Sequence, residues 1–162
     1  MHRKKVREGS GTVKKPTLCI SGDTPRLVCM VYFSYMSHSI LLVEDSEPLR
    51  KVLAEKLRME KFEVYDAGGG EEGLKIGQDK KPDMVITDVV MFPMDGLEMA
   101  RQMRAAGTWG EEVQIIALTN QNSSEEEARL KDLNLNAYLV KAETALDDVV
   151  KHVKEIFKNK KK

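Results

Sequence analysis

The sequence predicts an α/β domain built on a parallel five-stranded sheet with helices on both faces. Two observations favour this fold class. Five short apolar runs have the length and composition of buried strands, and between them apolar residues recur at the three- and four-residue spacing of helices. Strands that alternate with helices are joined by crossover connections, which make the strands parallel and place the helices against the sheet. The predicted strands cover residues 40–43, 62–65, 84–87, 113–118 and 137–140.

The first two predicted helices differ in quality. The first covers about residues 47–59 and has Ser46 at its N-cap position. Its apolar residues recur at helical spacing: Leu49, Val52, Leu53 and Leu57. The second helix, predicted over 71–78, contains Gly73 and Gly77, and both glycines lower its helix propensity.

The remaining helices are predicted from turn and capping signals. A third helix follows the Asp-Gly turn signal at 95–96 and ends near Gly107. Serines and glutamates at 123–127 suit a capping box, so a fourth helix is predicted to run to about Leu133. The last helix, residues 146–157, carries its apolar side chains along one face.

Charge divides the chain into parts. Its 162 residues suggest one domain, or two at most, and its formal net charge is zero. Residues 1–39 hold seven Lys and Arg against two acidic residues, so this part carries +5 and the remainder carries −5. We therefore expect 1–39 to be a basic, disordered N-terminal arm, 40–158 to be the folded domain and 159–162 to be a basic tail. An alternative is that the protein naturally starts at Met36, in which case the residues before it would not belong to the native protein.

Cysteine content and hydropathy bear on the compartment. Both cysteines, Cys19 and Cys29, lie in the arm, so the domain has no thiol pair for a disulfide, which fits a reducing compartment. The longest apolar run, residues 27–33, is too short to span a bilayer. No small-residue cleavage pattern follows it, as a signal peptide would require. These features predict a cytoplasmic protein that does not attach to a membrane.

Polar residues follow four of the predicted strands directly. Glu44 and Asp45 end the first strand, Asp88 the third, Thr119 the fourth and Lys141 the fifth. In a doubly wound parallel sheet these ends open on one edge, where ligands bind. Crowded carboxylates raise each other's pKa unless a cation joins them, and an all-oxygen cluster favours a hard ion, here Mg²⁺. Carboxylates can accept phosphoryl groups, and Asp88, central and alone, is the best candidate nucleophile.

Each of these residues, taken alone, also has an ordinary structural explanation. Glu44 and Asp45 would suit a helix dipole, Thr119 a turn and Lys141 a solvated surface. Their joint placement at matched strand ends favours a functional site, in which Lys141 and Thr119 would complement phosphoryl oxygens.

The ordered motifs resemble the receiver domain of two-component response regulators. The resemblance covers residues 39 to about 158. Five motifs carry it: Ile-Leu-Leu-Val-Glu-Asp at 40–45, Val-Ile-Thr-Asp-Val-Val-Met at 85–91, Met-Asp-Gly-Leu-Glu at 94–98, Ile-Ile-Ala-Leu-Thr-Asn at 115–120 and Ala-Tyr-Leu-Val-Lys at 137–141. Any one motif alone would be weak evidence, but the ordered set is specific.

The resemblance implies a flavodoxin-like fold with strand order 2-1-3-4-5 and a role for each strand-end residue. Asp88 would accept a phosphoryl group from a phosphohistidine of a sensor histidine kinase or phosphotransfer protein. Asp45, Asp88 and the backbone carbonyl of Val90 would bind Mg²⁺, and Glu44 would act mainly through water. Lys141 would pair with the phosphoryl group, and the Thr119 hydroxyl would donate a hydrogen bond to it.

The resemblance also implies an output. Tyr138 matches the family's switch aromatic, which turns inward as Thr119 moves toward the phosphate. The phosphorylated state would then alter binding to a downstream protein, in a monomer or a phosphorylation-dependent dimer, without direct nucleic-acid binding. We do not expect a turnover enzyme.

Two alternatives stay open. One is a phosphorylation-independent interaction module on the same fold, and the other is a hydrolase with an aspartyl-phosphate intermediate. The hydrolase would need a general acid two residues after Asp88, where Val90 cannot serve. The chain departs from the family pattern in the loop after Asp88, where Pro93 falls one residue late, and after Lys141, where Ala142 replaces a frequent proline.

Overall fold

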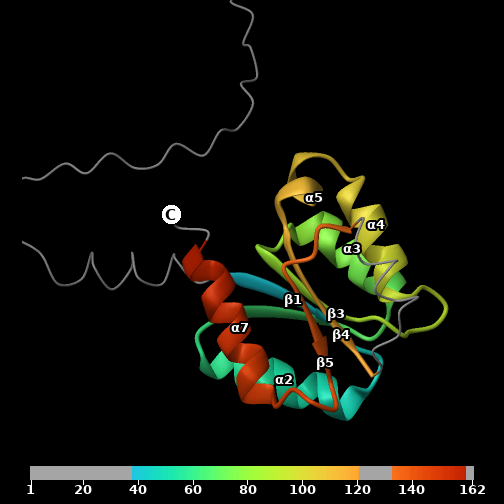
Figure 1. The fold of residues 1–162 in the computed structure, drawn as a ribbon. Coiled ribbons are helices and arrows are strands. Elements are labelled where there is room, and N and C mark those ends of the chain that lie inside the picture. Colours follow the sequence, from blue (N-terminus) through green and yellow to red (C-terminus); the bar gives the residue numbers. More distant parts are fainter. Residues whose placement is uncertain (1–37, 121–132, 160–162) are drawn as a thin grey trace, which may run out of the picture. The chain divides into compact units, whose positions relative to one another are not determined.

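The computed structural model describes residues 38–120 and 133–159, and Figure 1 shows their fold. The elements follow in this order: β1 (Ser39–Val43), α2 (Glu47–Met59), β2 (Glu63–Ala67), α3 (Gly70–Lys80), β3 (Met84–Asp88), α4 (Gly96–Arg104), α5 (Thr108–Glu112), β4 (Gln114–Thr119), β5 (Ala137–Val140) and α7 (Leu146–Asn159). The predicted strands are all present, with bounds shifted by at most two residues.

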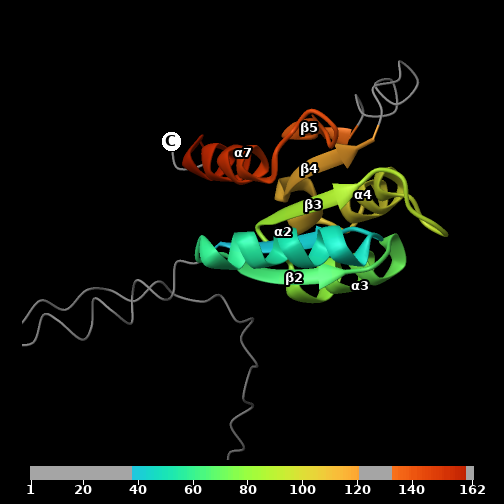
Figure 2. The same cartoon turned by 90° about the horizontal axis from the view of Figure 1, so that it is seen from below.

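The five strands form one parallel sheet in the order β2-β1-β3-β4-β5, which confirms the predicted fold class and strand order. Figure 2 shows the strands side by side in this order. Val43 at the end of β1 is paired with Thr87, and Asp88 at the end of β3 is paired with Leu118. This register brings the carboxyl ends of the central strands level at one edge of the sheet.

Helices cover both faces of the sheet (Figure 1). On one face, Leu41 and Val43 pack with side chains of α3 and α4. On the other, Ile40 and Leu42 pack with side chains of α2 and α7. Because both faces are buried, the central strands are continuously apolar rather than alternating. This explains why short apolar runs identified them.

The helices near residue 107 differ from the prediction. α4 ends at Arg104, three residues before Gly107, and a short helix that was not predicted, α5, begins at Thr108. Gly107 has a φ of +82°, a conformation that interrupts a helix. The Arg104 guanidinium then donates hydrogen bonds to the carbonyls of Gly110 and Val113, which holds the short helix against the end of α4.

Several predictions concern residues outside the described ranges. These are the arm with its cysteines and apolar run, the start at Met36, the end of the basic tail and almost all of the helix predicted to reach Leu133. They stay predictions. Among the helices within 38–120 and 133–159, none combines the length and hydropathy needed to cross a bilayer.

The two glycines of α3 have a packing role. A Cβ atom on Gly73 would lie 2.8 Å from Sδ of Met99 and 2.8 Å from Cγ2 of Val43, and one on Gly77 would lie 2.7 Å from Cε of Met103. The missing side chains therefore let α3 approach α4 and the sheet closely. The low helix propensity predicted from these glycines is compensated by this packing.

Gly96 begins α4 directly behind the end of β3. A Cβ atom there would lie 1.9 Å from the carbonyl oxygen of Asp88 and 2.6 Å from Oγ1 of Thr87. We expect Gly96→Ala to lower the free energy of unfolding by about 2–3 kcal/mol, because main-chain atoms must move to admit the methyl group. Urea denaturation of both proteins measures the difference.

Gly69→Ala is the matched control for this substitution. A Cβ atom on Gly69 has no neighbour within 4 Å, and its backbone is extended. This variant should stay within about 1 kcal/mol of the wild type, the cost of a poorer N-cap. Equal losses in the two variants would show that steric conflict at Gly96 is not the cause.

Candidate functional site

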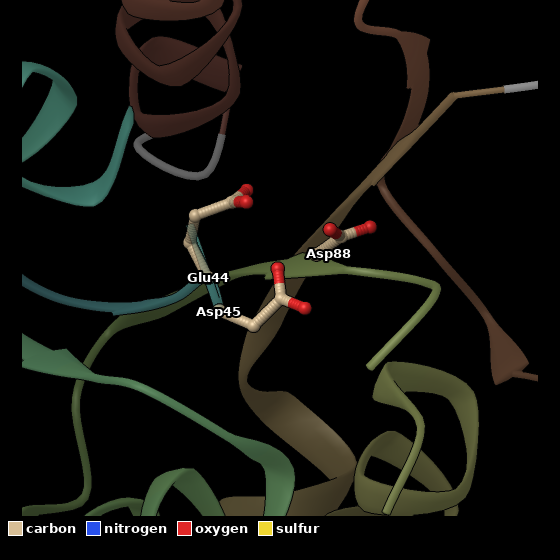
Figure 3. Close-up of side chains that lie close together, drawn as sticks. All are labelled: Glu44, Asp45 and Asp88. Carbon is tan, nitrogen blue, oxygen red and sulfur yellow. The ribbon is translucent and has the colours of Figure 1, made fainter. Parts of the chain in front are cut away.

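The carboxyl edge of the sheet brings together the residues predicted at the strand ends. Figure 3 shows three of them, Glu44 and Asp45 after β1 and Asp88 at the end of β3. One carboxylate oxygen from each lies within 4.8 Å of the others. Glu44 and Asp88 are buried, whereas Asp45 is exposed to solvent. The sequence prediction of an acidic cluster is confirmed, and the structure adds that one member faces outward.

Lys141 lies between two of these carboxylates. Its Nζ is 2.6 Å from Oδ2 of Asp88 and 2.7 Å from Oε2 of Glu44. Its backbone N–H donates a 2.7 Å hydrogen bond to the carbonyl of Thr119, which continues the alignment of β5 with β4 beyond the strand. The pairing of these two strands thus aims the lysine side chain at the acidic cluster.

Burial and charge shift two pKa values in this cluster. Burial raises the pKa of the Glu44 carboxyl above its usual value and Asp88 adds to the rise, while Lys141 opposes it. Burial by itself would lower the pKa of Lys141, but its contacts with Asp88 and Glu44 outweigh this and raise it. Lys141 is therefore a cation at neutral pH.

The loop after Asp88 is hydrogen-bonded to the Asp88 side chain. The backbone N–H of Val90 donates a 3.1 Å hydrogen bond to Oδ1 of Asp88, and the N–H of Gly96 donates to the carbonyl of Val89. Val90 itself is 59% exposed. The Phe92–Pro93 peptide bond in this loop is cis. Asp88 thus has one oxygen held by backbone and one by Lys141.

The donor set of this cluster fits Mg²⁺. It supplies carboxylate oxygens only, and hard divalent cations prefer oxygen ligands. The solvent-facing Asp45 gives access from outside. The three carboxylates together carry more negative charge than the single ammonium of Lys141 can balance, so a further cation would be stabilised here. Direct coordination by the Val90 carbonyl stays a prediction.

Thr119 and Tyr138 lie on the neighbouring strands β4 and β5. Thr119 ends β4 and is fully buried. Tyr138 on β5 is half-buried, is paired with Ala117 and packs on the face of the sheet covered by α3 and α4. The switch role of Tyr138 stays a prediction.

Sequence analysis missed one residue that touches the site. Arg50 of α2 donates a 2.6 Å hydrogen bond to the main-chain carbonyl of Glu44. The available signal was weak: a basic residue near the start of a helix that begins directly after the acidic pair. Helical spacing places such a residue near the preceding strand end but does not show what its long side chain contacts.

Sequence comparisons show which known proteins this chain resembles. The family model described as "Response regulator receiver domain" matches residues 40–154. The chain is 31% identical over 126 residues to the response regulator MprA of Mycobacterium ulcerans, which covers 78% of this chain and 53% of that protein. It is 34% identical over 84 residues to the transcriptional regulatory protein AfsQ1 of Streptomyces coelicolor, covering 52% of this chain and 36% of that protein. The matched part is thus about half, or less, of these relatives.

Solved structures give the same result. The chemotaxis response regulator CheY4 of Vibrio cholerae has a TM-score of 0.68 and 26% identity, with 75% of this chain and 99% of that chain covered. A CheY-like receiver domain protein from Methanospirillum hungatei has a TM-score of 0.71 at 21% identity, covering 77% of this chain and 97% of that one. The second comparison speaks for the fold alone.

Proposed function

Because the chain belongs to the response regulator receiver domain family of two-component signalling, we propose that Asp88 is its phosphoacceptor. The observation that carries this proposal is the position of Lys141, whose Nζ lies 2.6 Å from Asp88 Oδ2 within a cluster of three carboxylates. A buried carboxylate with a cation already beside it is suited to receive a charged phosphoryl group.

The proposed reaction is transfer from a phosphohistidine of a sensor histidine kinase or phosphotransfer protein. A carboxylate oxygen of Asp88 forms a bond to phosphorus as the phosphorus–nitrogen bond breaks, and the electron pair of that bond stays on the imidazole of the donor. The Lys141 ammonium pairs with the phosphoryl oxygens, and the Thr119 hydroxyl donates a hydrogen bond to them. Asp45, Asp88 and the Val90 carbonyl would hold Mg²⁺ directly and Glu44 would act mainly through water, and the ion would supply charge neutralisation.

The proposed output is a change in protein binding. When a phosphoryl group on Asp88 draws Lys141 and Thr119 toward it, the Glu44–Lys141 contact weakens, and the ends of β4 and β5 shift together because Lys141 N–H is bonded to the Thr119 carbonyl. Tyr138 lies on the same strand and would change its packing.

The test is phosphorylation of the purified chain by a small phosphodonor such as acetyl phosphate. With Mg²⁺ present we expect the intact mass to rise by one phosphoryl group, and with excess chelator we expect no rise. Borohydride reduction of the product should convert the modified aspartate to homoserine, and peptide mapping should find it at position 88. A Mg²⁺-independent product, or modification at another residue, would refute the proposal.

A further inference from the structure

The side chain of Arg50 joins two strand ends beside the acidic cluster. Its Nη1 donates a 2.6 Å hydrogen bond to the carbonyl of Glu44, and its Nε lies 3.8 Å from Oδ2 of Asp66 on β2. Only 19% of the side chain is exposed. One guanidinium therefore spans the turn that carries Glu44 and the neighbouring edge strand.

The main chain at Glu44 needs this support because the sheet ends there. β1 pairs with β3 only as far as Val43, opposite Thr87. Glu44 still donates its N–H to the carbonyl of Ala67, but its own carbonyl, in a residue that is 1% exposed, is held by Arg50. A buried carbonyl must keep a hydrogen-bond partner, so the position of this turn depends on the arginine.

The carboxylates of Glu44 and Asp45 project from this same turn. The orientation of Glu44 is further limited by the N–H of Ser46, which donates to Oε1, and by Lys141, which donates to Oε2. Asp45 is exposed, so the main chain is the principal restraint on its carboxylate. A shift of the turn would move this carboxylate away from Asp88 more readily than it would move Glu44.

We propose that Arg50 is a positioning residue for cation binding: its hydrogen bond to the Glu44 carbonyl holds the turn so that Asp45 and Asp88 converge on one ion. The inference rests on the proposed function, because it takes the acidic cluster to be a Mg²⁺ site. Groups that orient metal ligands without touching the metal commonly contribute tenfold or more to affinity.

Electrostatics and positioning predict opposite signs for the loss of Arg50. A guanidinium close to the site repels a divalent cation, so removing its charge alone would tighten Mg²⁺ binding. Loss of the hydrogen bond to Glu44 would instead loosen the turn and weaken binding. The direction of the change therefore distinguishes the two effects.

Arg58 is the matched control on the same helix. It also pairs with Asp66, at 2.7 Å, and donates to the carbonyl of Val64, so its described contacts lie on β2 and not on the turn at Glu44. Arg58→Met thus removes one positive charge and one partner of Asp66, as Arg50→Met does, and leaves the Glu44 carbonyl with its donor.

The experiment is a calorimetric Mg²⁺ titration of the full chain, with amide shifts of Glu44, Asp45 and Asp88 followed by NMR. We expect the Kd for Mg²⁺ to rise about tenfold in Arg50→Met and to stay within about twofold of wild type in Arg58→Met. An unchanged or lower Kd in Arg50→Met would overturn the inference.

Failure of the proposed function and failure of the positioning role give different results. If the wild type itself bound no Mg²⁺, the proposed function would fail and the inference with it, whereas normal wild-type binding with an unaffected Arg50→Met would refute only the positioning role. If Arg50→Met did not fold, Arg50→Lys would decide. The lysine ammonium keeps the positive charge but, unlike the planar guanidinium, cannot contact both Glu44 and Asp66. A raised Kd in Arg50→Lys supports the inference, and an unchanged one overturns it.

Discussion

Asp88→Asn is expected to abolish phosphorylation by acetyl phosphate in the presence of Mg²⁺, with a rate at least about 100-fold below that of the wild type. The amide has nearly the shape of the carboxylate, so the fold should survive. The amide lacks the negative oxygen that attacks phosphorus in the proposed reaction, and the substitution removes one of the three carboxylates of the cluster. Intact-mass measurement over time gives both rates.

Asp79→Asn is the control for this substitution. Asp79 lies near the end of α3 with 71% of its side chain exposed, so the same chemical change is made outside the acidic cluster. Its phosphorylation rate should equal that of the wild type. Persistence of the product in Asp88→Asn would assign the acceptor to another residue and contradict the proposed mechanism.

Lys141→Met is expected to destabilise the domain as well as to slow phosphorylation. The substitution removes the cation from two buried carboxylates, Glu44 and Asp88, whose side chains are 1% and 3% exposed. Breaking a buried ion pair by removing one partner commonly costs several kcal/mol, so we expect the free energy of unfolding to fall by about 3 kcal/mol in metal-free buffer at pH 7. Urea denaturation measures the loss, and added Mg²⁺ should reduce it.

Lys154→Met tests whether burial, rather than ion pairing as such, causes this loss. Lys154 lies 2.6 Å from Glu60, as close as Lys141 lies to Asp88, but both side chains of that pair are more than 40% exposed. Solvent screens such a pair, so this variant should lose less than about 1 kcal/mol. Similar losses in the two lysine variants would contradict a special role for the buried lysine.

The pH dependence of the Lys141→Met effect follows from the pKa shifts. The raised pKa of Lys141 means that its stabilising contribution is fully present below the ordinary lysine value of 10.5 and is lost as pH rises through the higher folded-state value. The raised pKa of Glu44 means that its ionisation costs stability as pH rises above the ordinary value of 4.5. The Glu44–Lys141 pair carries both charges only between these two pKa values. The difference in the free energy of unfolding between wild type and Lys141→Met should therefore be greatest near neutral pH and shrink at acid and at strongly alkaline pH.

Local patterns in the sequence determined the parallel sheet and the strand-end residues that meet in the candidate site. Buried strands must be apolar, and residues that follow parallel strands must meet at one edge, so Asp88 and the other strand-end residues could be identified before any contact was known. The alternation of strands with helices likewise determined that the strands are parallel, and the resemblance to the receiver family supplied their order.

Only the tertiary structure decided which side chains touch and why certain residues stand where they do. Lys141 contacts Asp88 and Glu44, which lie 53 and 97 positions before it in the sequence, and such contacts depend on strand register and side-chain rotamers rather than on spacing. The glycines of α3, which weaken the helix in isolation, are required by the closeness of α4, a property of packing. The hydrogen bond from Arg50 to Glu44 belongs to the same class, because a long side chain has many rotamers and only the folded surroundings select one.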